Sequence, residues 1–202
     1  KAIDLYHRVA SYFSKSRGVN LIHPRGGLAS HLGREIDKIE TIVVESELEA
    51  LILEANLIKK YLPTFNVRLT DDKDYLYIGI TREDFPKVVT IRKQDLKKVK
   101  KFFGPFPSAR TVRDTLKMLR RVFPWCNGKG YGRTCFYYHI GLCPGACIGL
   151  ISKEEYNKII KRFAKFLEGK KEELVAELVE EMMKLSGQQK YEQAAKLKKM
   201  LD

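Results

Sequence analysis

The 202-residue sequence has no long apolar run, only four cysteines, and fewer acidic than basic residues. A membrane-spanning helix needs about 20 consecutive apolar residues, so the sequence predicts no membrane segment and no membrane partner. The chain also opens without an apolar secretory stretch. We therefore expect a soluble, cytoplasmic protein whose thiols stay reduced or bind metal.

Acidic residues are outnumbered, with 25 Asp and Glu against 38 Lys and Arg and a net charge of +13. The imbalance is uneven, because residues 151–202 hold 12 basic and 10 acidic residues and leave +11 on residues 1–150. A strongly basic front half favours contact with a polyanion, most simply DNA or RNA. An acidic protein partner and a merely basic domain are the alternatives.

The few cysteines all fall in one window of 22 residues, in the pattern C-x8-C-x7-C-x3-C: Cys126, Cys135, Cys143 and Cys147. Four thiolates gathered by glycine-rich turns indicate a metal or iron–sulfur site. Two disulfides would need an oxidising compartment. Structural zinc sites usually contain short C-x2–4-C pairs, and only the last spacing qualifies. The long gaps favour iron–sulfur, with zinc as the alternative.

Periodicity along the chain predicts helices and a few short strands. Helices are expected over residues 2–14, 46–61 and 109–123, and over most of 153–202 with breaks at Gly169 and Ser186-Gly187. Strands are expected over 41–44 and in two runs between 75 and 92. The last two helices predict an antiparallel hairpin that packs on a partner, on a second copy or on the core of this chain.

Two of the predicted helices carry charges in places that suit a function. Glu54 lies midway along the helix 46–61 at the border of its apolar stripe, where it suits a metal-binding or catalytic carboxylate or is an ordinary boundary glutamate. The helix 109–123 carries basic residues at helical spacing, which predicts either a stripe along a phosphate backbone or a solvated face. They are Arg110, Arg113, Lys117, Arg120 and Arg121.

Four stretches of the sequence resemble the N-terminal half of the UvrC family, the dual-incision subunits of bacterial nucleotide excision repair. They are ESELEALILEANLIKKYLPTFNVRLTDDKDYLYI, FFGPFPSARTVRDTLKMLRRVFP, LCPGACIGLISKEEY and QQKYEQAAKLKKML. The resemblance covers most of residues 1–15 and nearly all of 41–202. It implies an endonuclease that makes the 3′ incision in lesion-containing DNA at a GIY-YIG site.

In that site the resemblance implies that Glu54 holds a single Mg²⁺ or Mn²⁺. The catalytic side chains that it implies are Lys1, Arg8, Tyr12 and Asn66. The sequence departs from the family in having no GIY triplet, and the Tyr-Ile-Gly at 77–79 comes after the glutamate helix. We therefore expect a domain that lacks its first hairpin and little incision by this chain alone. A non-catalytic fragment or adaptor that binds DNA and UvrB is the alternative.

The resemblance also implies an α+β fold with four parts. Residues 1–70 are a GIY-YIG domain without its first strands, 71–123 a basic β/α linker domain, 124–152 the cysteine segment, and 153–202 a helical region. The four cysteines are expected to hold a four-iron four-sulfur cluster. Residues of about 167–202 resemble the UVR motif, a helical hairpin that docks on UvrB. Its contacts are expected at Tyr191, Ala194 and Leu197.

Overall fold

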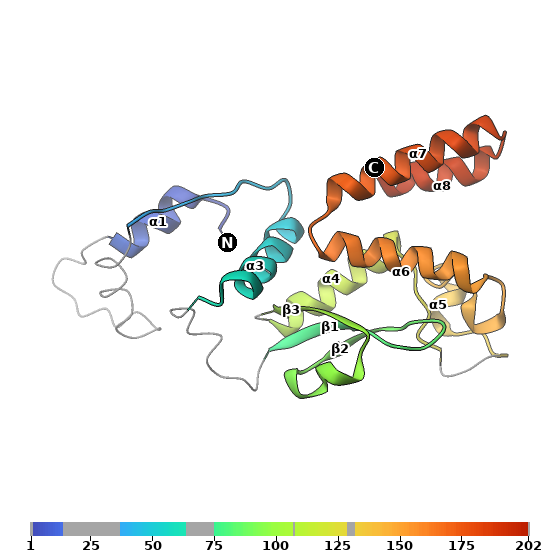
Figure 1. Ribbon diagram of the computed structural model, residues 1–202, viewed down its shortest axis with the longest axis horizontal. Helices are drawn as coiled ribbons and strands as arrows, with labels where there is room; N and C mark the ends of the chain where they lie inside the picture. Colours follow the sequence, from blue (N-terminus) through green and yellow to red (C-terminus); the bar gives the residue numbers. More distant parts are fainter. Residues whose placement is uncertain (1, 14–36, 64–74, 107, 129–131, 202) are drawn as a thin grey trace.

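The computed structural model describes residues 2–13, 37–63, 75–106, 108–128 and 132–201 and has a mixed α and β fold (Figure 1). The α-helices are α1 (Leu5–Phe13), α3 (Glu47–Tyr61), α4 (Ala109–Val122), α5 (Phe136–His139), α6 (Lys153–Leu167), α7 (Lys171–Gly187) and α8 (Tyr191–Leu201). The strands are β1 (Leu76–Ile80), β2 (Val88–Ile91) and β3 (Lys101–Phe106), with 3-10 turns at Lys93–Lys98 (η2) and Ala146–Ile148 (η3). This agrees with the predicted α+β class.

The sheet is a three-stranded antiparallel sheet with β1 in the middle. Ile78 pairs with Thr90 on β2 and with Phe103 on β3, and its side chain is fully buried. Strands β1 and β2 confirm the two predicted runs. Strand β3 was not predicted, because Gly104 and Pro105 interrupt its sequence. Gly104 adopts φ +121°, a conformation that residues with a Cβ atom rarely adopt.

Helix α3 packs its apolar face on β3. The hydroxyl of Ser46 caps its start by accepting a hydrogen bond from the Glu49 N–H at 3.1 Å. The strand expected just before it, over 41–44, is wrong: Ile42 and Val43 are 57% and 85% exposed and the segment has no strand structure. A strand needs a neighbour to receive its hydrogen bonds, and among the described residues no strand pairs with this segment.

Helices α4 and α6 enclose the main core. The hydroxyl of Ser108 caps the start of α4 by accepting a hydrogen bond from the Thr111 N–H, and the helix packs on β1 and β3 with Val112 buried. Phe163 of α6 lies in the same core and meets the Trp125 ring at 5.4 Å between centroids. This core brings the segment after α4 against the middle of α6.

Helices α7 and α8 lie side by side and form the predicted helical pair (Figure 1). Helix α1 is set apart from the sheet and from α3 in the same view. Among the described residues, none of the helices has both the length and the apolar character of a membrane span.

Candidate functional site

The four cysteines, which lie far apart along the segment, come together in space. Their Sγ atoms all lie within 4.8 Å of one another, and all four are free thiols. Three of these side chains are buried and Cys135 is half-buried. Cys135 lies directly before α5, and Cys147 lies in η3. Free thiols at this spacing do not support the disulfide alternative.

Backbone turns and one tyrosine hold this cluster in place. Gly145 has φ +87°, and a Cβ atom there would approach Cβ of Leu150 to 2.8 Å, so the turn between Cys143 and Cys147 requires glycine. On the opposite side, the Cys126 N–H donates to the Tyr156 hydroxyl at 3.0 Å. That hydroxyl donates to the Pro86 carbonyl at 2.8 Å. One fully buried side chain therefore links the first cysteine to the loop between β1 and β2.

Burial sets the protonation of the thiols. It raises the pKa of Cys126 and, to a larger extent, the pKa of Cys143, since a buried thiolate loses its hydration. Burial also acts to raise the pKa of Cys135, but hydrogen bonds from the Cys143 thiol and the Tyr138 N–H outweigh it and lower that pKa. A bound cation stabilises thiolates in such a place.

The residues present fit a thiolate-bound metal centre. A single tetrahedral ion with metal–sulfur bonds of about 2.3 Å holds its four sulfurs about 3.8 Å apart, which is within the 4.8 Å limit found here. A four-iron cluster is larger and holds its cysteines farther apart, so it would require these loops to open. Four soft sulfur donors suit both a single zinc ion and an iron–sulfur cluster.

The basic face of α4 is partly as predicted. Four of its five basic residues are exposed: Arg110, Arg113, Lys117 and Arg121. Arg120 is a correction, because it is only 5% exposed. It follows the buried Val112 by eight residues, a little over two helical turns, and therefore lies on the apolar side of the helix. It cannot reach a phosphate backbone from this position.

The residues assigned to the nuclease site are not gathered in the described part of the chain. Glu54 is half-buried on α3, and Arg8 is exposed on α1, which Figure 1 shows set apart from α3. Tyr12 lies in α1, but its side chain is outside the described set. Lys1 and Asn66 also lie outside the described residues. Their joint role stays a prediction.

The expected UvrB contacts divide into one exposed and two buried residues. Tyr191 is 64% exposed, whereas Ala194 and Leu197 are each 8% exposed. The two buried residues lie within the helical pair, where Leu197 belongs to the hydrophobic core. Of the three, Tyr191 is the exposed one, and the part of all three in UvrB binding stays a prediction.

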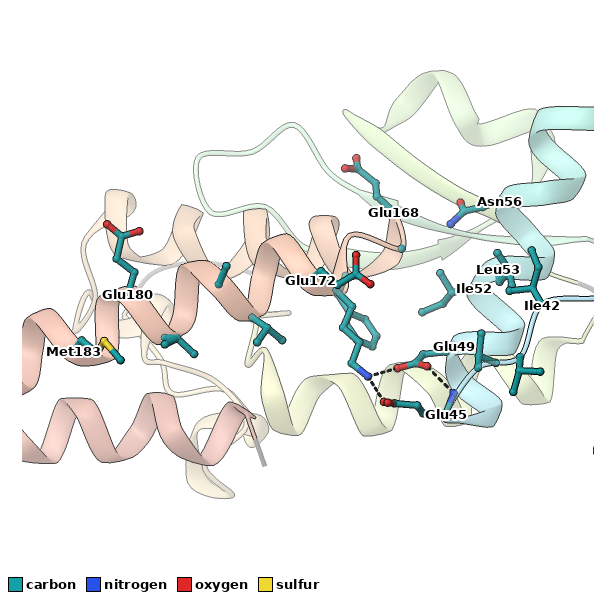
Figure 2. Close-up of a pocket in the computed structure, with 18 residues that line it drawn as sticks. Ile42, Glu45, Glu49, Ile52, Leu53, Asn56, Glu168, Glu172, Glu180 and Met183 are labelled. Atoms are coloured by element: carbon teal, nitrogen blue, oxygen red, sulfur yellow. Dashed lines mark hydrogen bonds and ion pairs between the residues drawn. The ribbon is translucent and has the colours of Figure 1, made fainter.

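An apolar groove of about 1080 Å³ that the sequence did not predict runs between residues 42–45, α3 and α7 (Figure 2). At one end, the Lys171 ammonium lies 2.6 Å from carboxylate oxygens of both Glu45 and Glu49. Its hydrogen bond lowers the pKa of Glu49. These ion pairs join α7 to the start of α3.

Comparison with known proteins gives matches along most of the chain. Residues 1–67 match a family model described as a UvrC-like GIY-YIG domain, and residues 75–166 match one described as the UvrC/Cho excinuclease middle domain. The chain is 46% identical over 98% of its length to UvrABC system protein C of Caldanaerobacter subterraneus subsp. tengcongensis. It is 42% identical over its whole length to UvrABC system protein C of Clostridium acetobutylicum.

A third relative, UvrABC system protein C of Nitrosomonas europaea, is 41% identical over 98% of the chain. The chain spans about a third of these relatives, with 32%, 33% and 32% of their lengths covered in the order given. No solved structure matches it.

Proposed function

The chain belongs to the UvrC family, and on that premise we propose that it is part of an excision nuclease subunit that makes the 3′ incision in lesion-containing DNA. The observation that carries this proposal is the order of the two family matches, a GIY-YIG domain followed by the UvrC middle domain. The names of the similar proteins, each a UvrABC system protein C, support the same pathway.

In the proposed nuclease site Glu54 is the ligand of a divalent ion, Mg²⁺ or Mn²⁺. Such an ion supplies Lewis-acid stabilisation of charge on phosphate oxygens. Arg8 adds a cation that faces the same phosphate. Lys1, Tyr12 and Asn66 complete the site by positioning the phosphate and the attacking water. The half-buried place of Glu54 on a packed helix supports its part, because a rigid support limits the freedom of a ligand.

DNA and UvrB are the proposed partners. The exposed arginines and lysine of α4 suit contact with a phosphate backbone and make binding depend on salt. The pair formed by α7 and α8 is proposed as the UVR hairpin, with Tyr191 as its exposed aromatic contact. Aromatic side chains are frequent anchors of protein interfaces.

On the resemblance to the UvrC family, the four cysteines are proposed to hold a four-iron four-sulfur cluster; zinc, which the present sulfur spacing accommodates without movement of the loops, is the alternative. In either form the metal centre joins the segment after α4 to α5, η3 and α6. Its proposed role is structural, since it ties together a glycine-rich segment whose cysteines lie far apart along the chain.

The test of the nuclease proposal is the substitution Glu54→Gln in the full-length protein, assayed with UvrA, UvrB and lesion-containing DNA. We expect the 3′ incision rate to fall at least about 100-fold, because a lost metal ligand removes several kcal/mol of transition-state stabilisation. Glu47→Gln, the same change at an exposed position of the same helix, is the control and should cut normally. Retained 3′ incision by the Glu54 variant would reject the assignment.

A second candidate is a non-catalytic adaptor that binds DNA and UvrB. The separation of α1, which carries Arg8, from α3, which carries Glu54, favours it (Figure 1). It predicts normal binding to both partners and no cutting by the unsubstituted protein in the same assay.

A further inference from the structure

Arg120 is a buried cation beside the four cysteines. Its Nη2 donates to the Trp125 carbonyl at 2.9 Å. Its guanidinium carbon lies 3.4 Å from the centroid of the Tyr137 ring and 4.4 Å from that of Trp125. Tyr137 follows Cys135 by two residues and Trp125 directly precedes Cys126. The rings that enclose the guanidinium are therefore attached to the metal-site segment itself.

Two buried N–H groups at this place have no acceptor. Among the described residues, the only buried side-chain nitrogen or oxygen atoms without a partner are Nε of Arg120 and Nε1 of Trp125. An unsatisfied buried donor costs about 1–3 kcal/mol, and such groups are rare enough in folded proteins that each calls for an explanation. Both donors belong to residues in contact with each other, so one acceptor site can serve both.

In the described part of the chain, the partners of the Arg120 guanidinium are the Trp125 carbonyl and the rings of Trp125 and Tyr137, and none of them is a carboxylate. Burial lowers the pKa of its guanidinium, and the neighbouring charges of Tyr137 and then of the Cys143 and Cys135 thiols act in the opposite direction. A buried ion without a counter-charge costs several kcal/mol. Arginine does not escape this cost by losing its proton.

A metal centre would supply the missing negative charge. Four thiolates around one Zn²⁺ carry a net charge of −2, and four thiolates around a four-iron four-sulfur core of charge +2 carry the same. Sulfur atoms also accept N–H hydrogen bonds, and such contacts tune metal–sulfur centres. The identity of the metal therefore does not change the role left for Arg120.

We propose that Arg120 is the counter-cation of the four-cysteine metal centre, and that its Nε–H and the Trp125 indole N–H, which have no sulfur acceptor in this structure, donate to sulfur atoms of the bound centre. This inference rests on the metal centre proposed above and goes beyond it by naming the residues outside the ligand set that determine metal affinity. Arg120 is in this sense a positioning residue. It explains why an arginine occupies the apolar side of α4.

The test is Arg120→Met, which keeps a long side chain and removes the charge and the N–H donors. Metal-free protein is titrated with Co²⁺ without oxygen, and binding is followed by the thiolate-to-cobalt absorption. The free energy of unfolding is measured for the metal-free and the cobalt-loaded forms. We expect the Kd for Co²⁺ to rise about 10–100-fold, the usual cost of losing an outer partner of a metal site. The metal-free variant should be at least as stable as the metal-free parent.

Three further proteins complete the design. Trp125→Phe keeps an aromatic ring but removes the indole N–H together with the five-membered part of the indole, and it should weaken Co²⁺ binding by a smaller factor. Arg120→Lys keeps the charge, and its Kd for Co²⁺ should lie between that of the parent and that of Arg120→Met. Arg121→Met makes the same change at the exposed neighbouring position and should leave the Kd unchanged. If a metal-free variant does not fold, the rate of cobalt loss to a chelator from the loaded protein replaces the titration and should rise at least about tenfold.

The inference would be overturned if Arg120→Met left the Co²⁺ affinity unchanged and lowered the stability of the metal-free and cobalt-loaded forms equally. Arg120 would then serve only to pack between the two aromatic rings. A parent protein that binds no Co²⁺ and is purified without iron or zinc would refute the metal centre itself. The two failures are thus distinct.

Discussion

The Tyr156 hydroxyl makes two buried hydrogen bonds, and Tyr156→Phe removes only that hydroxyl. The residue is fully buried. Its hydroxyl accepts from the Cys126 N–H at 3.0 Å and donates to the Pro86 carbonyl at 2.8 Å. Burial raises the pKa of Tyr156 far above its ordinary value, so the hydroxyl keeps its proton and remains a donor at any working pH.

Phenylalanine at this position would leave the Cys126 N–H and the Pro86 carbonyl without their partner. Each unsatisfied buried group costs about 1–3 kcal/mol, so we expect the two together to lower the free energy of unfolding by about 2–6 kcal/mol. With a urea m-value of roughly 2 kcal/mol/M, the unfolding midpoint shifts by about 1–3 M. The measurement is urea denaturation of anaerobically purified protein, followed by circular dichroism.

The matched control is Tyr61→Phe, which removes the same atom from a residue that is 65% exposed. We expect it to change stability by less than about 0.5 kcal/mol. If Tyr156→Phe costs no more than this control, the hydroxyl does not link the cysteine segment to the sheet. Faster metal loss to a chelator should accompany the destabilisation, because Cys126 loses its backbone anchor.

Four other outcomes are expected. Anaerobically purified protein should contain iron and acid-labile sulfide, and Cys147→Ser should abolish both; zinc without iron would contradict the cluster. Arg113→Gln should lower the salt dependence of DNA binding by about one unit of log–log slope, whereas Lys184→Gln, an exposed change on α7, should not. Tyr191→Ala should weaken UvrB binding at least about fivefold, and the equally exposed Tyr61→Ala should not; equal affinities in a titration would exclude the contact. Hydrogen bonds from Lys165 and Arg162 lower the pKa of Glu177, so its stabilising effect is present above the ordinary glutamate pKa and is lost as the pH falls through the lowered folded value. Unfolding curves of Glu177→Gln and the parent should therefore differ at pH 7 and converge below about pH 4; a difference that is independent of pH would refute this reasoning.

The groove of Figure 2 shows where prediction from local patterns ends. One wall comes from residues 42–45 and α3, and the other from α7, which lies more than 100 residues later in the chain. The ion pairs of Lys171 with Glu45 and Glu49 join the same distant segments. No pattern within one segment predicts such a contact, because Lys171, Glu45 and Glu49 each have the sequence context of an ordinary surface charge.

What the sequence determined by itself is local. The caps at Ser46 and Ser108 and the helix after each depend on neighbouring residues, and the structure begins those helices where predicted. The cysteine window and the resemblance to the UvrC family are likewise properties of the chain alone, and the family matches agree with the resemblance. Short-range hydrogen bonds and side-chain periodicity account for these successes.

Only the tertiary structure decided which faces meet. It made a strand of residues 101–106 in spite of Gly104 and Pro105, and it left residues 41–44 without one, because strand formation depends on a partner distant in sequence. It placed Arg120 inside the protein between two aromatic rings while Arg121 stayed at the surface. A difference of one residue on a helix is 100° of rotation, and only packing decides which of two adjacent arginines is buried.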